Sequence, residues 1–370
     1  MAVDQFRDVA KKIHRLKKMV IGYLNHDTKN NTGAGRFYNS FVKAAKKMMP
    51  DLQAEVLTAE NILYPNKLKL ILALPAIKKI LNRCDVIHAL DGWPYGVVAA
   101  LVNRKLNKPL IITAIGTGAV KPFYSWWRRP IMKWAYRQAD KVVAVSSNTK
   151  KEIQKFLPDL EIEVINHGVD FNKFEIRNPK SGTNSKFEKF KPYILSVGAW
   201  KPRKGFDYSL KAFDAIRDKF PDLQYVIVGN PPQNIKEKYS RVIFLNNLPE
   251  DDLIALYKNA ELFILLPQND DKNVDIEGFG LVFLEAAAAG LPVIGTRDSG
   301  ASDAVLDGKN GFLIPQKDHA SAAHAIEKIL MDKKMKEKFS AQSLKFAKEM
   351  SWERVATLYQ KIYSKFINNE

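Results

Sequence analysis

The chain has 370 residues, of which 46% are hydrophobic, and its 58 Lys and Arg exceed its 40 Asp and Glu by a formal net charge of +18. This length exceeds one ordinary hydrophobic core and favours two domains. The single cysteine, Cys84, excludes a disulfide framework and fits a reducing compartment. The N-terminal residues lack the apolar segment of a secretory signal, and no run of about twenty apolar residues predicts a membrane span.

The positive charge is concentrated in the first half of the chain. Residues 1–170 contain 28 Lys and Arg and 14 Asp and Glu, a net charge of +14, whereas residues 171–370 contain 30 and 26, a net charge of +4. A strongly basic half indicates a polyanionic partner, for which nucleic acid, an anionic membrane surface and a phosphorylated substrate all qualify.

Apolar segments rich in Val, Ile and Leu alternate with amphipathic segments of helical length. In the first half, strands are predicted in "KMVIGYL", "DVIHAL", "PLIITAIG" and "KVVAVS", and a helix is predicted in "RFYNSFVKAAKKM". In the second half, strands are predicted in "YILSVGAW", "LQYVIVGN", "RVIFLNN", "ELFILLP", "LPVIGT" and "GFLIP". This alternation is typical of parallel sheets with helices on both faces.

The alternation pauses at residues 166–191, where "RNPKSGTNSKFEKFKP" is rich in Pro, Gly, Ser, Asn and Lys. We therefore predict an α/β fold with two doubly wound, Rossmann-like domains, at residues 1–170 and 192–350, joined by a linker or loop at 171–191. A terminal helix at 351–370 is expected to cross back to the first domain. Such sheets bind ligands at the carboxyl ends of their strands, and two domains facing each other would form a cleft.

The segment "NTGAGR", residues 31–36, follows the first predicted strand and precedes a helix. Its glycines would let a ligand approach the backbone, and a helix N-terminus favours an anion. A turn that binds no ligand explains the same residues, because the segment lacks the lysine of a P-loop and the full dinucleotide fingerprint.

A cluster of cations follows the first strand of the second half, in "SVGAWKPRKGFD". Lys201, Arg203 and Lys204 stand where a helix starts, and cations are unfavourable at that end of the helix dipole. Any one of these residues fits a solvated surface. The whole cluster, together with Gly205, favours a phosphate site because an anionic ligand would relieve the repulsion.

Two glutamates, Glu277 and Glu285, enclose the largely apolar segment "GFGLVFL". With "GLVFLEAAAAG" on a helix, Glu277 stands just before the helix and Glu285 lies two turns further on. Each glutamate alone fits an N-terminal or exposed helical acid. As a pair, the carboxylates could accept hydrogen bonds from hydroxyls, while backbone amides at the helix start could hold phosphate, which suits a sugar nucleotide.

These residues resemble glycosyltransferase family 4, which comprises retaining enzymes of the GT-B fold. The resemblance rests on the two glutamates separated by seven residues, with "GFG" and "EAAAAGLPVIG" around them. Other stretches follow in family order over nearly the whole chain: "NTGAGR", "DVIHAL", "GTGAV", "ADKVVAVSS", "VINHGVDFNKF", "KPRKG", "VIVGN", "DGKNGFLIP" and "SWERVATLYQKIY".

The resemblance implies catalytic roles for three residues. Glu277 would contact hydroxyls of the transferred sugar, and Lys204 with Arg203 would neutralise the departing diphosphate. The other implied donor-binding residues are Glu285 for the ribose, Phe244 and Leu245 for the base, and Gly198, Lys201, Phe279, Gly280 and Leu281 for the phosphates. Gly33, Ala34, Gly35, Gly116 and Thr117 would form a loop region facing the donor phosphates or the acceptor. No metal or cofactor is expected; the nucleotide sugar is a substrate, and "DD" at 251–252 is interpreted as a helix start.

Two positions depart from the family pattern. Ile115 stands where the family often has a histidine, and Ala199 stands where it often has an arginine. The resemblance implies that both positions lie where transition-state charge would be stabilised. Lys201 is a candidate to replace the arginine. His26 and His88 come from nearby predicted strand ends, although a lone histidine also fits a structural role.

Two segments of the basic half combine cations with apolar or aromatic residues. Residues 2–18 form an amphipathic pattern, and residues 121–137, "KPFYSWWRRPIMKWAYR", interleave aromatic and basic side chains. This composition suits an interface with anionic lipids, single-stranded nucleic acid, or a partly buried surface with snorkelling cations. No RNA-recognition motif or zinc-knuckle spacing supports nucleic acid.

The sequence thus predicts a metal-independent, retaining glycosyltransferase that moves a sugar from a nucleotide-sugar donor to a glycan or lipid-linked acceptor. We expect it to act in cell-envelope polysaccharide or glycolipid synthesis, in the cytoplasm and peripherally on the inner face of the membrane. The alternative is a catalytically weakened homologue that binds sugar nucleotide or membrane without turnover, which Ile115 and Ala199 motivate.

Overall fold

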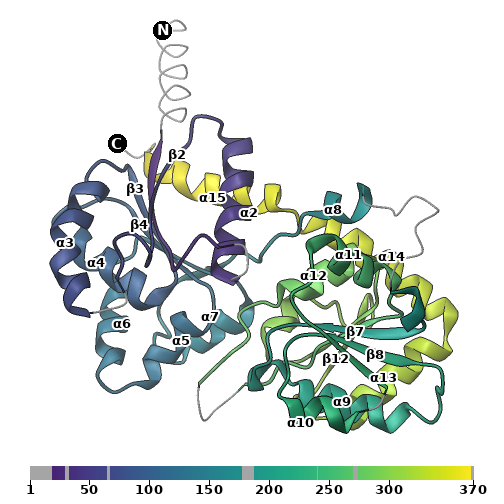
Figure 1. The fold of residues 1–370 in the computed structure, drawn as a ribbon. Coiled ribbons are helices and arrows are strands. Elements are labelled where there is room, and N and C mark those ends of the chain that lie inside the picture. The colour runs from purple at the N-terminus through teal and green to yellow at the C-terminus, as the bar shows by residue number, and fades with distance from the viewer. Residues whose placement is uncertain are drawn as a thin grey trace, which may run out of the picture. The chain divides into compact units, whose positions relative to one another are not determined.

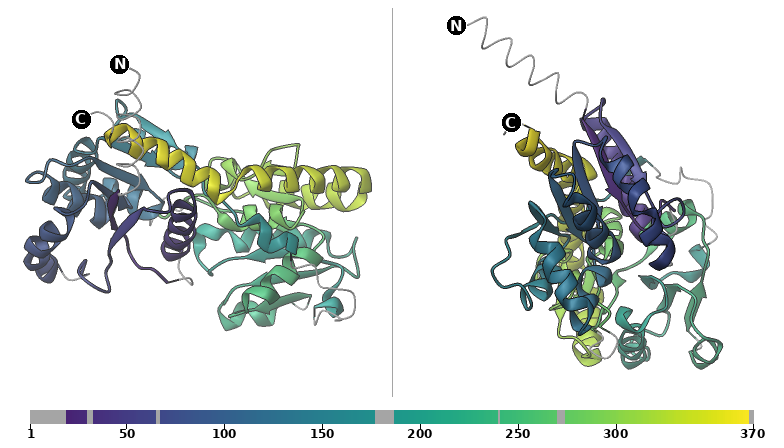
Figure 2. Two further views of the ribbon diagram at one scale, coloured as in Figure 1. Left: turned by 90° about the horizontal axis from the view of Figure 1, so that it is seen from above. Right: turned by 90° about the vertical axis from the view of Figure 1, so that its left-hand side faces the viewer.

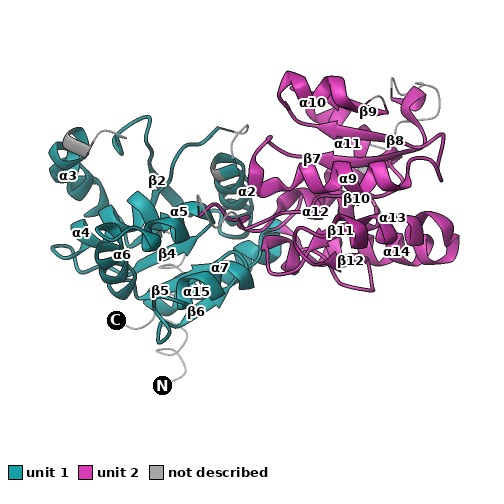
Figure 3. Cartoon of the chain, turned by 90° about the horizontal axis from the view of Figure 1, so that it is seen from below, with its two compact units in different colours: residues 1–167, 352–370 teal, residues 168–351 magenta. Residues whose placement is uncertain are grey.

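The computed structural model describes residues 19–29, 33–64, 67–176, 187–239, 241–269 and 274–367. The chain forms two compact units, coloured separately in Figure 3. Unit 1 comprises residues 1–167 and 352–370, and unit 2 comprises residues 168–351. The amphipathic pattern predicted at residues 2–18 lies outside the described residues. No helix among the described residues is both long enough and apolar enough to cross a lipid bilayer.

Unit 1 contains a parallel six-stranded sheet with the order β2-β1-β3-β4-β5-β6. The strands are β1 (Val20–Leu24), β2 (Gln53–Leu57), β3 (Val86–Leu90), β4 (Leu110–Ala114), β5 (Lys141–Ala144) and β6 (Ile162–Val164). All residues of β3 and β4 are buried. This burial explains their nearly continuous apolar sequences, because helices cover both faces of a doubly wound sheet.

The helices of unit 1 form two layers (Figures 1 and 2). They are α2 (Gly33–Met48), α3 (Lys67–Leu81), α4 (Val97–Asn103), α5 (Thr117–Val120), α6 (Arg128–Arg137), α7 (Ser147–Gln154) and α15 (Trp352–Ile367), with short turns η1 (Gly92–Gly96) and η2 (Lys121–Tyr124). The terminal helix α15 packs against α2. On the opposite face of the sheet, α3 packs on α4 and α4 packs on α6.

A buried hydrogen-bond network joins α15 to the sheet of unit 1. The imidazole of His88 lies 2.8 Å from the Tyr363 hydroxyl through Nδ1 and 2.8 Å from the Thr113 hydroxyl through Nε2. The Tyr359 hydroxyl lies 2.8 Å from Thr113 Oγ1, and the Tyr23 hydroxyl lies 3.3 Å from that of Tyr363. Burial lowers the pKa of His88 to about 3, so the ring is neutral at physiological pH.

Replacing Tyr363 with phenylalanine should destabilise unit 1 by about 1–3 kcal/mol, because His88 Nδ1 would lose its partner in a dry site. Thermal unfolding followed by circular dichroism would measure the change. Tyr64→Phe is the matched control, because Tyr64 is 37% exposed and its hydroxyl can be hydrated. Equal stabilities of the two variants would contradict a stabilising role for the network.

Unit 2 contains a second parallel six-stranded sheet, with the order β12-β11-β10-β7-β8-β9. The strands are β7 (Tyr193–Val197), β8 (Gln224–Val228), β9 (Val242–Leu245), β10 (Phe263–Ile264), β11 (Val293–Thr296) and β12 (Gly311–Ile314). The helices are α8 (Phe171–Ile176), α9 (Phe206–Ile216), α10 (Gln233–Lys238), α11 (Glu250–Asn259), α12 (Leu281–Ala288), α13 (His319–Met331) and α14 (Lys333–Glu349), with turns η3 (Glu188–Phe190), η4 (Pro202–Lys204) and η5 (Gly300–Asp303). Two doubly wound α/β units confirm the predicted fold class.

The first six residues of the predicted linker at 171–191 form a helix in the structure. Residues 171–176 form the short helix α8, which belongs to unit 2, and residues 177–186 lie outside the described residues. The division between the two units falls after His167. Helix α8 escaped prediction because six residues are too few to display a helical period.

Candidate functional site

The candidate site of unit 2 lies where the strand order of its sheet reverses. β7 and β10 are neighbours, and the chain continues from them to opposite edges of the sheet. In doubly wound sheets, ligands bind outside the carboxyl ends of the strands at this switch point. Turn η4 follows β7, and residues 277–280, which lead into α12, follow β10. The predicted catalytic residues stand in these two segments.

Glu277 is the centre of a buried ion cluster. Its Oε2 lies 2.5 Å from Arg203 Nη1 and 2.7 Å from Lys204 Nζ, so the second carboxylate oxygen carries neither ion pair. Asp275 Oδ2 lies 3.2 Å from Arg203 Nε. Burial on its own would raise the pKa of Glu277, but Lys204 and Arg203 outweigh it and lower that pKa. Glu277 is therefore ionised at neutral pH and relieves the repulsion expected between the two cations.

Close backbone approaches bring the two segments together. Gly205 has a left-handed φ of 66°, and a Cβ at this position would lie 1.7 Å from the carbonyl oxygen of Leu266, just after β10. Gly280 has φ 82° and caps α12. A Cβ on Gly300 would lie 2.5 Å from the carbonyl oxygen of Glu277. Backbone passes backbone at Gly205 and Gly300, whereas Gly280 is favoured by its left-handed φ.

The remaining residues predicted to bind the donor differ from one another in burial and in hydrogen bonding. Glu285, on α12, accepts a hydrogen bond from the buried Tyr257 hydroxyl at 3.0 Å. The Phe279 side chain is buried in the core, so only its backbone could serve a ligand. Lys201 is exposed and is not among the partners of Glu277. Gly198 follows β7, and Leu281 begins α12.

An aromatic surface accompanies the predicted base-binding residues. Trp200 stacks on Phe206 with ring centroids 4.6 Å apart and lies edge-on to Phe244 at 6.2 Å. Phe244 and Leu245 are the last residues of β9 and are partly buried. Sequence reasoning missed Trp200, although a tryptophan directly after a predicted strand and before a cation cluster could have indicated it.

Three further residues of this site were missed in the sequence. Asp275 pairs with Arg203 from a position 72 residues further along the chain, and Tyr257 lies on α11, 28 positions before Glu285. Gln268 donates its backbone amide to the Arg203 carbonyl at 2.8 Å, and its side-chain Oε1 is buried without a hydrogen-bond partner. Nothing in the local sequence around Gln268 distinguishes it from an ordinary loop residue.

Unit 1 has a switch point between β1 and β3, and polar residues gather there. His26 Nδ1 lies 2.8 Å from the Tyr95 hydroxyl, and His26 Nε2 lies 3.7 Å from Asp27 Oδ2. Asp91, directly after β3, has φ 134° and accepts a hydrogen bond from the Gly92 amide at 2.8 Å. Sequence reasoning missed Asp91; the Asp-Gly pair at a strand end was the available signal.

The burial of Asp91 favours the neutral form of its carboxyl group. Burial raises its pKa to about 7, although hydrogen bonds from the amides of Gly92 and Ile115 act in the opposite direction. A Cβ on Gly118 would lie 2.1 Å from Asp91 Oδ2, so α5, the short helix after β4, packs directly on this carboxyl. Asp91 thus joins the loop after β4 to the end of β3.

The predicted glycine-rich segments of unit 1 lie near these polar residues. Gly33 begins α2, and Ala34 follows it in the first turn. A Cβ on Gly35 would lie 2.0 Å from the Lys29 carbonyl oxygen, so chain packing already requires a glycine there. Gly116 caps the four-residue helix α5, which Thr117 begins.

The two histidine candidates separate clearly. His88 is fully buried in the network that anchors α15, so the hypothesis that it replaces the missing histidine in catalysis is wrong. The His26 side chain is 62% exposed at the carboxyl edge of the sheet and stays a candidate. The sequence could not distinguish them because Tyr363, the partner that ties His88 to α15, lies 275 positions further along the chain.

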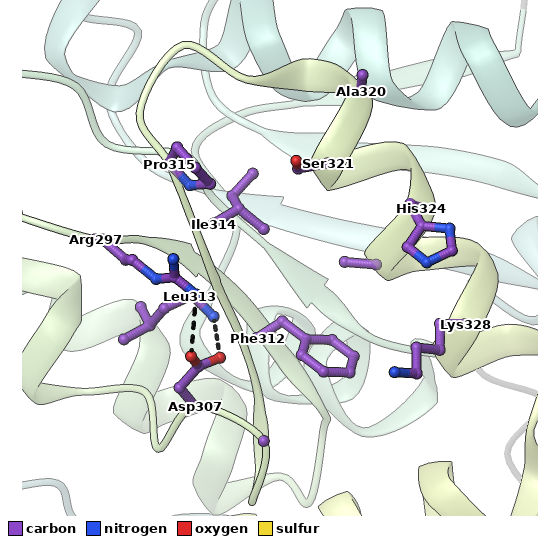
Figure 4. Close-up of a pocket in the computed structure, with 12 residues that line it drawn as sticks. Arg297, Asp307, Phe312, Leu313, Ile314, Pro315, Ala320, Ser321, His324 and Lys328 are labelled. Atoms are coloured by element: carbon purple, nitrogen blue, oxygen red, sulfur yellow. Dashed lines mark hydrogen bonds and ion pairs between the residues drawn. The ribbon is translucent and has the colours of Figure 1, made fainter.

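The pocket in Figure 4 lies elsewhere in unit 2, between β12 and α13. It has a volume of about 800 Å³ and contains Phe312, His324 and Lys328, with the Arg297–Asp307 ion pair at one side. No residue predicted to bind the donor lines it. Among the described residues, no three His, Cys, Asp or Glu side chains are grouped so that they could hold a metal ion.

Solved structures share this fold. The crystal structure of Anabaena HepE in complex with UDP and glucose has a TM-score of 0.73 and 19% identity, covering 94% of this chain and all of that chain. A glycosyltransferase from Rickettsia africae has a TM-score of 0.74 and 18% identity, covering 95% of this chain and all of that chain. The two doubly wound units therefore define a protein of the GT-B class.

Sequence comparisons give the family. The profile of Glycosyltransferase Family 4 matches residues 41–173, and that of Glycosyl transferases group 1 matches residues 179–346. The D-inositol 3-phosphate glycosyltransferase of Corynebacterium glutamicum is 30% identical over 318 residues, 77% of this chain and 73% of that protein. A GDP-mannose-dependent alpha-(1-6)-phosphatidylinositol monomannoside mannosyltransferase of Mycolicibacterium smegmatis is 29% identical over 285 residues, 71% of this chain and 73% of that protein. The chain belongs to glycosyltransferase family 4, which confirms the resemblance found in the sequence.

Proposed function

We propose that this glycosyltransferase transfers a sugar, with retention of configuration, from a nucleotide-sugar donor bound by unit 2. The observation that carries the proposal is the ion cluster of Glu277, Arg203 and Lys204 at the switch point, with Glu285 two helical turns further along. Cations, carboxylates and a helix start within one small region suit a ligand that combines a diphosphate with hydroxyl groups.

Each part of the donor has a proposed partner in unit 2. Lys204 and Arg203 bind the diphosphate and stabilise its charge as it leaves, which makes a metal ion unnecessary. The Glu277 oxygen outside the ion pairs accepts hydrogen bonds from sugar hydroxyls. Glu285 accepts from the ribose hydroxyls, and Tyr257 fixes the orientation of its carboxylate. Trp200 and Phe244 provide an aromatic surface for the base.

We propose that unit 1 binds the acceptor, a glycan or a lipid-linked glycan. Relatives named for inositol phosphate and phosphatidylinositol mannoside acceptors support an anionic or lipid-linked substrate, and the basic charge of residues 1–170 is consistent with it. This acceptor class leads us to propose a role in envelope polysaccharide or glycolipid synthesis, in the cytoplasm and peripherally on the membrane.

The donor site is tested by isothermal titration with UDP and GDP. Lys204→Ala and Glu285→Ala should each weaken binding of the preferred nucleotide by about ten- to a hundredfold, because charge-assisted hydrogen bonds contribute roughly 1.5–3 kcal/mol. Lys219→Ala removes a cation from a half-exposed surface ion pair and serves as the control. Affinities equal to the wild type in both site variants would exclude the proposed site.

Turnover separates the proposal from the alternative of a weakened homologue, which Ile115 and Ala199 favour. A panel of sugar nucleotides is incubated with glycan and lipid acceptors, and nucleoside diphosphate release and the anomeric configuration of the product are measured. Transfer with retained configuration is expected. Tight nucleotide binding without transfer or donor hydrolysis across the panel would support the alternative.

A further inference from the structure

Helix α3 has apolar residues on both of its sides. Ala73, Ile77 and Leu81 are buried. On the opposite side, Leu72 is 71% exposed and Ile71 is 60% exposed, and Pro75 and Ala76, spaced three and four positions after Leu72, are exposed as well. A helix that is apolar all round is normally covered all round. In the described part of the chain, no segment covers this outer stripe.

The exposed apolar residues continue beyond α3. Nine large hydrophobic side chains are exposed among the described residues, and six of them lie between residues 64 and 126. Leu101 is exposed on α4, which packs on α3 and α6 (Figure 1). Trp126, 85% exposed, stands two positions before the first residue of α6. We call the layer formed by α3, α4 and α6, with Trp126, the α3–α6 layer.

Trp126 and Trp127, which both belong to the aromatic and basic segment 121–137, have different environments in this layer. The Trp127 ring packs edge-on against Trp93 with centroids 5.8 Å apart, and the Arg128 guanidinium lies 4.6 Å above it. Trp127 therefore stabilises the protein itself. Trp126 leaves most of its surface to solvent, an unfavourable position for a large aromatic side chain unless another surface covers it.

The charge of the layer indicates what covers it. Residues 64–137 contain 13 Lys and Arg but only two acidic residues, Asp85 and Asp91. Both carboxylates accept hydrogen bonds from backbone amides, Asp85 from Val20 at 2.8 Å and Asp91 from Gly92 at 2.8 Å. Lys79 on α3 and Arg137 on α6 are exposed cations of the same layer. Exposed apolar residues in a layer with unbalanced positive charge match an anionic lipid surface.

We propose that the α3–α6 layer docks on an anionic lipid bilayer, with Ile71, Leu72 and Trp126 entering the headgroup region. This inference rests on the proposed peripheral association and names the surface responsible, one that includes α3, where the sequence indicated only residues 2–18 and 121–137. Lipid fits better than single-stranded nucleic acid, because Ile71 and Leu72 cannot stack on bases.

The test is co-sedimentation with vesicles of phosphatidylcholine alone or mixed equally with phosphatidylglycerol. The wild type should sediment with the mixed vesicles at low salt and bind more weakly as salt rises. The double variant Ile71→Glu/Leu72→Glu should partition at least about tenfold more weakly, because one fully buried aliphatic side chain accounts for roughly one decade in affinity. Trp126→Ala should weaken binding as well.

Met331→Glu is the matched control, because Met331 is 65% exposed but belongs to unit 2. It should partition like the wild type. UDP or GDP titration of the double variant should equal the wild type, which shows that the variant is folded and tests the donor site separately from lipid binding. The exposed positions make folding of the variant secure, since neither side chain is buried.

Each other outcome is decisive. A wild type that stays in solution with anionic vesicles overturns both membrane association and the proposed surface, and binding to a single-stranded oligonucleotide would then assign the positive charge to nucleic acid. A double variant that sediments like the wild type overturns the α3–α6 layer alone. Complete loss of sedimentation on deletion of residues 1–17, with the double variant unaffected, would assign docking to that segment.

Discussion

Replacing Glu277 with glutamine is expected to lower the free energy of unfolding of unit 2 by about 3–5 kcal/mol at neutral pH, because removing one partner of a buried ion pair leaves the others uncompensated. Arg203 and Lys204 would then face each other in a site where each side chain is less than a fifth exposed. Calorimetric unfolding measures the loss. Added nucleoside diphosphate should reduce it, since a bound anion replaces the missing carboxylate and stabilises the folded state.

Asp275→Asn is the control for this variant. Asp275 lies 3.2 Å from Arg203, and its side chain is 24% exposed against 9% for Glu277, so its neutralisation should cost less than that of Glu277. If Glu277→Gln unfolds no earlier than Asp275→Asn, the cluster does not depend on the Glu277 charge. A Glu277→Gln variant that nucleotide fails to stabilise would show that the two cations are not available to a diphosphate.

The contribution of the Glu277 charge to the stability of unit 2 should depend on pH. Because Lys204 and Arg203 outweigh burial and lower the pKa of Glu277, its contribution to stability is complete above the ordinary glutamate pKa of about 4.3. The contribution is lost as pH falls through the lower, folded-state pKa. The stability difference between wild type and Glu277→Gln should therefore be constant from neutral pH to about pH 5 and shrink below it.

The fold was predictable because buried parallel strands are recorded locally in the sequence. β3 and β4 are nearly unbroken apolar runs bounded by polar residues, and no long-range information is needed to recognise them. The members of the ion cluster were also predictable one by one, from a cation cluster after a strand and from paired glutamates around a helix start.

The pairing within the site was beyond local reasoning. Arg203 and Glu277 meet across 74 positions, and only the adjacency of β7 and β10 brings them together. The same holds for His88, whose partner Tyr363 lies 275 positions away. The sequence period could not show that the outer side of α3 is exposed. Leu72, Pro75 and Ala76 have the same spacing whether they are buried or exposed.

The largest backbone effect is expected at Gly205. Alanine there should cost about 2–5 kcal/mol, because a left-handed residue with a Cβ costs roughly 1–2 kcal/mol and overpacking adds about 1–3 kcal/mol. The overlap is severe, since the new Cβ would stand 1.7 Å from the Leu266 carbonyl oxygen, and neither atom belongs to a side chain that could rotate away. The loop after β7 must then move away from β10.

Gly308→Ala is the control that separates the cost of the left-handed φ from the cost of the steric overlap. Gly308 has φ 69°, nearly the 66° of Gly205, but no atom lies within 4 Å of a Cβ built there. This control should therefore lose only the roughly 1–2 kcal/mol of the left-handed conformation. Because Gly205 directly follows Lys204, Gly205→Ala should also separate Lys204 from Glu277 and weaken nucleotide binding, whereas Gly308→Ala should not. Equal unfolding free energies and equal nucleotide affinities for the two variants would show that the close approach of Gly205 to Leu266 does not position the cation cluster.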